Sequence, residues 1–151
     1  MKELDQTDII ILEALIFDSR TSPTNLAKKI NKSEATVRNR IKKLVDVGII
    51  ENFGLDINAK LIGYKVVAYL GADLVDPERY VETIEYLKNL RKKELKTDIR
   101  IPNIYTAQGD HDILIELWAK DLDCFNDFIR EKIESNTNFS KICPAIIVDK
   151  L

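Results

Sequence analysis

The chain has 151 residues, a formal net charge of −2 and hydrophobic residues at 45% of its positions, which allows a packed core and excludes a disordered chain. Apolar runs such as Ile9–Leu12 are far too short to cross a bilayer. Glu3, Asp5 and Asp8 stand where a secretory signal peptide would be basic or apolar. We therefore expect a soluble, cytoplasmic protein.

The side-chain inventory offers little for catalysis or metal binding. Cys124 and Cys143 lack C-x-x-C spacing, and His111 is the single histidine. The sequence has no nucleophile–base arrangement, no glycine-rich phosphate loop and no metal-ligand spacing. We expect no catalytic residues, no metal and no cofactor. Abundant isoleucine and lysine, with few glutamines and a single methionine, are typical of a protein from a thermophile.

Three helices are expected in the first sixty residues. Asp5 can cap a first helix that runs to about Asp18, and Ser22 followed by Pro23 caps a second. Asn31 tolerates the left-handed conformation that ends a helix in a sharp turn. The inward-facing positions are Ile9, Leu12, Leu15 and Ile16 in the first helix and Leu26, Ala27 and Ile30 in the second.

A third helix follows the turn at Asn31. Ser33 caps it, Gly48 ends it, and its inward positions Val37, Ile41 and Leu44 follow helical spacing. Two short strands, Ile49–Asn52 and Gly54–Ile57, are expected to form a small hairpin, or wing. Two helices joined by a tight turn, with a wing after them, predict a winged helix-turn-helix domain.

Positive charge gathers on this predicted motif. Lys28–Lys43 contains seven basic residues and one acid, Glu34. Short polar and guanidinium side chains suit base edges, whereas lysines suit phosphates. The alternative is a three-helix bundle whose charged surface binds nothing. The candidate DNA-binding residues are Ser22, Lys32, Ser33, Ala35, Thr36, Arg38, Asn39, Arg40, Lys42 and Lys43.

The remaining residues predict strands and helices in the order βαββαβ. Asp76-Pro77 and Asp121 mark the two helix starts, and the order is that of a ferredoxin-like α+β sandwich with both helices on one sheet face. The expected strands are Tyr64–Leu74, Ile99–Thr106, Ile113–Ala119 and Cys143–Val148. The inward helix positions are Val81, Ile84, Leu87 and Leu90, then Leu122, Phe125, Phe128, Ile129 and Ile133.

The second sheet face is expected to meet a second subunit. Apolar residues occur on both parities of the strands, as at Ile113 and Leu114 or Ile146 and Ile147, so both faces of the sheet need cover. The predicted division is therefore a DNA-binding domain with a linker strand in residues 1–60 and a ferredoxin-like, assembling domain in residues 61–151.

The chain resembles the Lrp/AsnC family of feast/famine transcription regulators, in its archaeal form. The matching residues are Leu4-Asp5, Asp8, Ile11-Leu12, Asp18-Ser19-Arg20, Leu26-Ala27, Ser33, Val37, Arg40-Ile41, Leu44, Gly48-Ile49-Ile50, Gly63 and Gly109-Asp110-His111-Asp112 followed by Ile113-Leu114. Asn31 departs from the family, because many members have glycine there. The chain also ends at Leu151, soon after the last expected strand, so the tail-mediated assembly of longer members is not expected.

The resemblance implies a homodimer formed by back-to-back sheets of the regulatory (RAM) domain, assembly of dimers into octamers or open helices, and an amino-acid effector held between dimers. Asp112 would bind the effector's ammonium group, or alternatively only the amides of its own turn. Gly109 would allow close approach of a ligand, and we expect His111 to face solvent. The candidate effector-binding residues are Tyr105, Thr106, Gly109, Asp110, His111 and Asp112.

We expect a regulator that binds double-stranded DNA and senses a free amino acid or similar small molecule. The first alternative is a siroheme decarboxylase-like enzyme on the same two-domain fold, but such an enzyme needs histidine and arginine around its tetrapyrrole, and this chain has only His111. A stand-alone ligand-binding or scaffold protein is the second alternative. Such a protein would not need the exposed pair Arg38 and Arg40.

Overall fold

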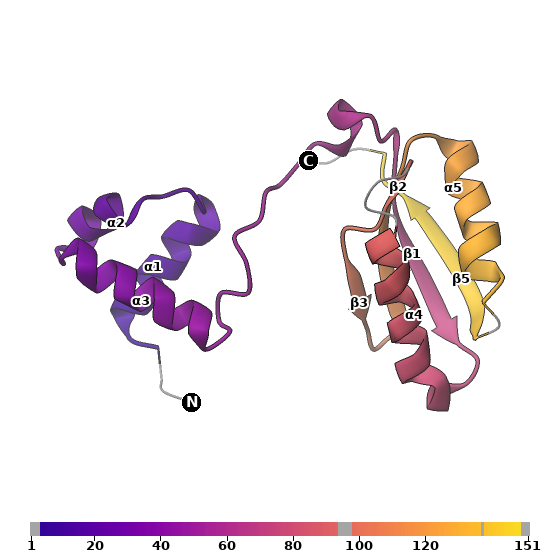
Figure 1. Cartoon of the computed structure of the whole chain (residues 1–151), viewed down its shortest axis with the longest axis horizontal. Helices are drawn as coiled ribbons and strands as arrows, with labels where there is room; N and C mark the ends of the chain where they lie inside the picture. Colours follow the sequence, from indigo (N-terminus) through magenta and orange to yellow (C-terminus); the bar gives the residue numbers. More distant parts are fainter. Residues whose placement is uncertain (1–3, 94–97, 137, 149–151) are drawn as a thin grey trace. The chain divides into compact units, whose positions relative to one another are not determined.

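The computed structural model describes residues 4–93, 98–136 and 138–148 (Figure 1), so Leu151 lies outside the described residues. The chain divides into two compact units, Met1–Asp56 and Ile57–Leu151. The boundary comes earlier than the expected one after residue 60, because the 3₁₀ helix η1 (Ala59–Ile62) belongs to the second unit. In the described ranges, no helix combines the length and the apolar character that crossing a membrane requires.

The first unit contains three helices, α1 (Gln6–Phe17), α2 (Pro23–Ile30) and α3 (Glu34–Asp46). Each starts at a predicted cap, since the side chains of Asp5, Ser22 and Ser33 each accept a backbone N–H from the first turn. Asn31 takes φ 51° and ψ 51°, the left-handed conformation that turns the chain from α2 into α3. The predicted helix-turn-helix is confirmed.

A small apolar core joins these helices, and it consists of Ile11, Leu15, Leu26, Ala27, Val37 and Leu44. The prediction for α2 and α3 holds, with Ile30 and Ile41 packed at the edge of this core. For α1 it is partly wrong, because Ile11 is completely buried whereas Ile16 is 83% exposed and Ile9 is also exposed. The apolar stripe of α1 is rotated relative to the expected one, since Ile11 and Leu15 lie one turn apart at its centre.

The expected hairpin of the wing is wrong. Gly48 takes φ 78°, and the amides of Ile49 and Ile50 both donate to the carbonyl of Leu44, which directs the chain back along the end of α3. Residues 51–58, all within the described ranges, form neither helix nor strand. They are also exposed, and a short two-stranded hairpin on its own is marginal in water.

The second unit is built on an antiparallel sheet of strand order β2-β4-β1-β5, in which β3 also pairs with β4. Figure 1 shows β1 and β5 as neighbouring arrows that point in opposite directions. The strands are β1 (Val66–Leu74), β2 (Ile99–Arg100), β3 (Ile104–Thr106), β4 (Ile113–Ala119) and β5 (Phe139–Ile146).

The helices of this unit cover one face of the sheet. They are η2 (Pro77–Arg79), α4 (Tyr80–Lys93), α5 (Leu122–Phe128) and the π-helix η4 (Ile129–Glu134). Leu87 and Leu90 of α4 and Phe125 and Phe128 of α5 form one buried cluster with alternate residues of β1 and β4. The βαββαβ order and the capping of α5 by Asp121 are confirmed.

The opposite face of the sheet carries side chains that all stay at least partly exposed. Strand alternation and register bring these residues to one side. We call this surface the open sheet face, and it is formed by Val67, Tyr69, Gly71, Leu114, Glu116, Trp118, Cys143, Ala145 and Ile147. The expected pattern of apolar residues on both faces is therefore present.

Several boundaries differ from those expected. The second strand is split into β2 and β3 around Pro102, which cannot donate to a strand ladder. β5 starts at Phe139, before the expected Cys143, and contains Pro144. Val81 and Leu122, expected to be buried, are exposed because each lies in the first turn of its helix, beyond the sheet.

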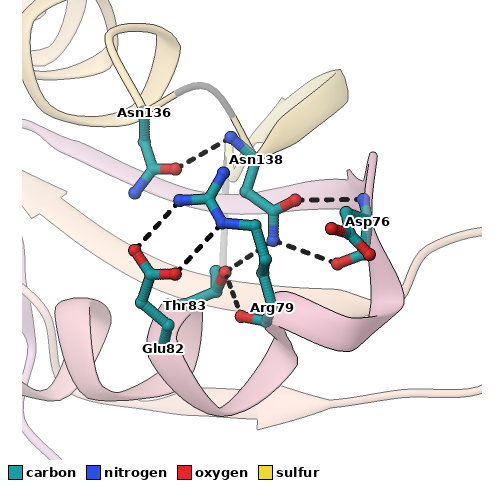
Figure 2. A network of polar contacts seen from close by, with 6 residues as sticks. All are labelled: Asp76, Arg79, Glu82, Thr83, Asn136 and Asn138. Carbon is teal, nitrogen blue, oxygen red and sulfur yellow. Dashed lines mark hydrogen bonds and ion pairs between the residues drawn. The ribbon is translucent and has the colours of Figure 1, made fainter.

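A buried polar network fixes the loop between β1 and α4 (Figure 2). The Asn138 side chain is almost completely buried; it accepts from the amide of Asp76 at 3.0 Å and donates to the hydroxyl of Thr83 at 2.7 Å. Thr83 in turn donates to the carbonyl of Arg79. Because these buried groups are satisfied, the network holds the start of α4 against β5.

Candidate DNA-reading helix and effector hollow

The turn that precedes α3 is tight and internally bonded. The amides of Asn31 and Lys32 both donate to the carbonyl of Ala27. Ser33 then accepts the amide of Thr36 at 3.1 Å and shares a 2.7 Å hydrogen bond with its hydroxyl. The N-terminal end of α3 is therefore held in a fixed direction relative to α2.

Most candidate DNA-binding residues lie on the exposed side of this motif, opposite buried Val37 and Leu44. Ser22 and Thr36 are half-buried, and Ser22 and Ser33 already use their hydroxyl oxygens as helix caps. A residue can serve as cap and phosphate ligand together, since the hydroxyl hydrogen stays able to donate. The exposed candidates are Lys32, Ser33, Ala35, Arg38, Asn39, Lys42 and Lys43.

Glu34, which was not expected to have a role, organises one end of this surface. Its carboxylate accepts from the Thr24 hydroxyl at 2.6 Å and from Arg38 Nε at 2.8 Å. These hydrogen bonds, from Thr24 first and then from Arg38, hold the pKa of Glu34 below its usual range. The i, i+4 spacing of Glu34 and Arg38 was the available signal. Arg38 stays 61% exposed and is presented outward.

Arg40 differs from Arg38, although both were expected to contact DNA. Its Nη1 atom lies 2.6 Å from Asp5 Oδ2 and 2.8 Å from Asp8 Oδ1, and the side chain is 29% exposed. Arg40 therefore ties α3 to the start of α1, and a contact with DNA through this atom would break those bonds. This geometry corrects the expected role of Arg40. The hydrogen bond from Arg40 also lowers the pKa of Asp5.

A hollow of about 810 Å³ lies beside the turn that joins β3 to β4. We call it the effector hollow. Only Asp112 among its lining residues carries a formal charge, and the rest are neutral. It is lined by Leu74, Pro77, Tyr80, Thr106, Ala107, Gln108 and Asp112.

Asp112 has a structural bond as well as a place in the hollow. Its Oδ2 atom accepts the amide of Leu74 at 2.9 Å, so it connects the turn to the end of β1. Its Oδ1 atom has no partner among the described residues. The carboxylate therefore satisfies a backbone amide of β1 rather than amides of its own turn, and the residue also lines a ligand-sized space.

His111 does not face solvent, contrary to expectation. Its ring is 17% exposed, and its Nδ1 atom lies 2.8 Å from Asp73 Oδ1. The ring also occupies the space next to Gly71, where no side chain competes for room. The sequence could not show this contact, since the two residues are 38 positions apart.

Only two of the candidate effector-binding residues, Thr106 and Asp112, line the hollow. Tyr105 points to the opposite sheet face from Thr106 by strand alternation, and Gly109, Asp110 and His111 are not part of the lining. The wall of the hollow opposite Thr106 and Asp112 is formed by Leu74, Pro77 and Tyr80, which were not predicted as effector-binding residues. It adjoins the turn because β1 pairs with β4 as far as Ala72 with Ile113, a register that the sequence does not display.

The comparisons with known proteins agree with this architecture. A family model described as winged helix-turn-helix DNA-binding matches residues 4–51. The HTH-type transcriptional regulator LrpA of Pyrococcus horikoshii is 40% identical over 148 residues, which cover 98% of this chain and 99% of the relative. Relatives of this kind are transcriptional regulators, which gives the decarboxylase-like alternative no support.

Solved structures give the same result for the whole chain. The AsnC structure of E. coli has a TM-score of 0.78 at 25% identity and covers 99% of this chain and 95% of its own. A transcriptional regulator of Neisseria meningitidis shares the fold, with a TM-score of 0.80 at 17% identity and coverage of 99% and 92%. On this evidence of sequence and fold, the chain belongs to the Lrp/AsnC family of transcription regulators.

Proposed function

We propose that the protein binds duplex DNA through the exposed side of α3 and that an amino acid in the effector hollow modulates its assembly. The observation that carries the DNA-binding part is the exposed basic surface next to a rigid turn, with Arg38, Lys42 and Lys43 all directed outward. Cationic side chains neutralise phosphates, and a helix of this kind fits the major groove.

The exposed residues divide into two roles. Ala35, Arg38 and Asn39, on the N-terminal half of α3, would contact base edges, while Lys32, Lys42 and Lys43 would contact phosphates. Ser22, Ser33 and Thr36 would donate hydroxyl hydrogens to the DNA backbone. Arg40 keeps a supporting role, since its ion pairs with α1 orient α3.

The effector is proposed to be a free amino acid. Asp112 Oδ1 would receive its ammonium group as a charge-assisted hydrogen bond, and the turn amides of Asp110 and His111 would receive its carboxylate. Gly109, with φ 148°, lets the backbone of this turn come close to a ligand. The regulator of Neisseria meningitidis was solved as a complex with L-Met, which supports an amino acid as ligand of this fold.

The proposed assembly is a homodimer that forms through the open sheet face, with four dimers in an octamer. Partly exposed apolar residues such as Val67, Leu114 and Trp118 lie on this face, and burying them against a second copy is favourable. A DNA-binding regulator of this type acts in the cytoplasm. The composition also fits a working temperature typical of a thermophile.

The DNA-binding proposal is tested by Arg38→Ala in fluorescence anisotropy with DNA selected from a random pool by the parent protein. Loss of a bidentate base contact should weaken binding by roughly 1–3 kcal/mol and relax the preference at one base position. Arg130→Ala is the matched control, since Arg130 is also exposed and also pairs with a nearby acid, Asp127, three residues earlier. Equal affinities for parent and Arg38→Ala would exclude Arg38 as a reading residue.

A further inference from the structure

Two neighbouring residues of the turn between β3 and β4, His111 and Asp112, contact different surfaces of the second unit. The turn is closed by a hydrogen bond from the amide of Ala107 to the carbonyl of Asp112. Asp112 lines the effector hollow, whereas His111, the preceding residue, places its ring against Gly71 of β1. One short, closed segment therefore touches the hollow and the sheet together.

Gly71 belongs to the open sheet face. It alternates with Leu70 and Ala72, which are both completely buried under the helices, and its register partners are Leu114 and Cys143. A Cβ atom at Gly71 would lie 2.2 Å from Cδ2 of His111, a distance at which one of the two groups must move. The histidine ring thus covers part of the face that we propose to meet a second subunit.

The other end of the His111 contact lies at an irregularity of the sheet. His111 Nδ1 bonds to Asp73, and the pairing of β1 with β5 shifts register between Ala72 and Leu74, on either side of Asp73. Leu74, the next residue, donates its amide to Asp112. The turn and the end of β1 are therefore joined by two parallel side-chain contacts, one from His111 and one from Asp112.

We propose that His111 is the positioning residue that couples the effector hollow to the open sheet face. An amino acid whose ammonium group binds Asp112 Oδ1 shifts the carboxylate, and with it the turn that Oδ2 ties to the amide of Leu74. His111 moves with the turn, which changes the surface above Gly71 where two copies meet. This inference rests on the proposed function, and it names how effector binding and assembly communicate. Such coupling is reciprocal, so assembly must also change effector affinity.

The test uses the full-length protein and a panel of the twenty L-amino acids. Isothermal titration calorimetry identifies the amino acid that gives the largest heat with the parent. Sedimentation velocity then measures the shift in assembly that this amino acid causes, and titrations at several protein concentrations measure whether its Kd depends on assembly. The variants are His111→Ala, Gly71→Ala and the double variant, each checked for parent-like folding by circular dichroism.

His111→Ala removes only the ring, which does not line the hollow, and keeps the backbone amide of the proposed carboxylate contact, so it should bind the same amino acid with a Kd within about threefold of the parent. Its sedimentation should no longer respond to the amino acid, and its Kd should no longer depend on protein concentration. Gly71→Ala should lose the response as well, because the new methyl group displaces the ring. In the double variant the methyl group at position 71 has room, because the His111 ring is absent, so its effector affinity and sedimentation should match those of His111→Ala. The double variant also keeps the test valid if Gly71→Ala alone folds poorly.

Three outcomes would overturn the inference, and they are distinguishable. A parent-sized sedimentation response in His111→Ala would contradict the coupling role alone. A loss of binding of more than about tenfold in His111→Ala would make His111 a ligand contact instead. A parent that binds none of the twenty amino acids would contradict the proposed effector, and the coupling with it.

Discussion

Two oxygens of one carboxylate have separate tasks at Asp112. Oδ2 accepts the amide of Leu74, and Oδ1 is the oxygen that we propose to bind the ligand, since Asp112 also lines the effector hollow. Replacement by alanine would remove both tasks together and so could not separate a ligand contact from a turn support. Replacement by asparagine separates them, because the amide oxygen still accepts the Leu74 amide while the negative charge is lost.

Asp112→Asn should therefore keep the stability of the parent and lose about tenfold or more in affinity for the amino acid effector, since a hydrogen bond to a charged group contributes about 1.5–3 kcal/mol. Asp112→Ala should lose the same affinity and also unfold at a lower temperature. Calorimetric titration and thermal unfolding give the two readouts. Parent-like affinity in Asp112→Asn would mean that Asp112 supports the turn and nothing more.

Acid should destabilise the first unit through Asp5. The hydrogen bond from Arg40 lowers the pKa of Asp5 in the folded protein. Its stabilisation is therefore present above the pKa of the unfolded chain, about 4, and is lost as the pH falls through the lower folded value. Glu34, whose pKa is also lowered, acts in the same direction.

Urea unfolding between about pH 2 and pH 6 measures this loss. Far-UV circular dichroism reports the helices of both units, whereas the single tryptophan, Trp118, reports the second unit alone. Asp5→Asn keeps a capping oxygen but loses the charge, so its stability should depend less on pH than that of the parent. An identical pH profile for the two proteins would show that the Arg40 pair adds no pH-dependent stability.

The sequence predicted side-chain roles well where the contacts are local and poorly where they are not. The caps Asp5, Ser22 and Ser33 and the buried Val37 and Leu44 follow from spacing of a few residues. The difference between Arg38 and Arg40 does not, because the partners of Arg40 lie more than thirty positions away on α1.

At the scale of the element, the turn between α2 and α3 depends on one unusual backbone conformation. Asn31 is the only residue other than glycine with positive φ in the described part of the chain. Asn31→Ala should destabilise the first unit by about 1 kcal/mol, the cost of a left-handed β-carbon, while Asn31→Gly should stay within about 0.5 kcal/mol of the parent. Urea midpoints followed by far-UV circular dichroism compare the three proteins. Equal stability of Asn31→Ala and parent would contradict this account of the turn.

Elements with long periodic patterns were predicted, and those that depend on neighbours were not. α3 is close to its expected position because it carries a clear apolar period, whereas α1 and β4 are nearly continuous apolar runs, bounded by the cap Asp5 in α1 and by polar residues in β4. The expected hairpin of the wing and the single second strand were wrong. A short hairpin depends on what it packs against, and Pro102 interrupts the ladder that an uninterrupted strand would need. The walls of the effector hollow depend in the same way on the register of β1 with β4.

At the scale of the whole molecule, a homodimer with two equivalent copies of α3 should read a pseudo-palindromic operator. Two half-sites on one face of the DNA should be separated by about 10 bp or a multiple of it, and an octamer should protect several such repeats. DNase I footprinting on selected operators, with sedimentation analysis of the same samples, measures both quantities. A monomer that protects one asymmetric half-site would contradict both the symmetry and the role of the open sheet face.

Two prolines at the edges of the sheet, Pro102 and Pro144, affect the non-specific association of copies of the protein. Pro102 breaks the β2–β3 edge into two short pieces. On the other edge the amide of Ile147 points inward to Val67, so by alternation the nitrogen of Pro144 points outward, where it offers no donor to a passing strand. Both borders of the sheet therefore resist the edge-to-edge growth that leads to aggregates, even at high protein concentration. Copies of the protein are therefore expected to associate through the face of the sheet, where the shape and chemistry of the side chains determine which partner binds.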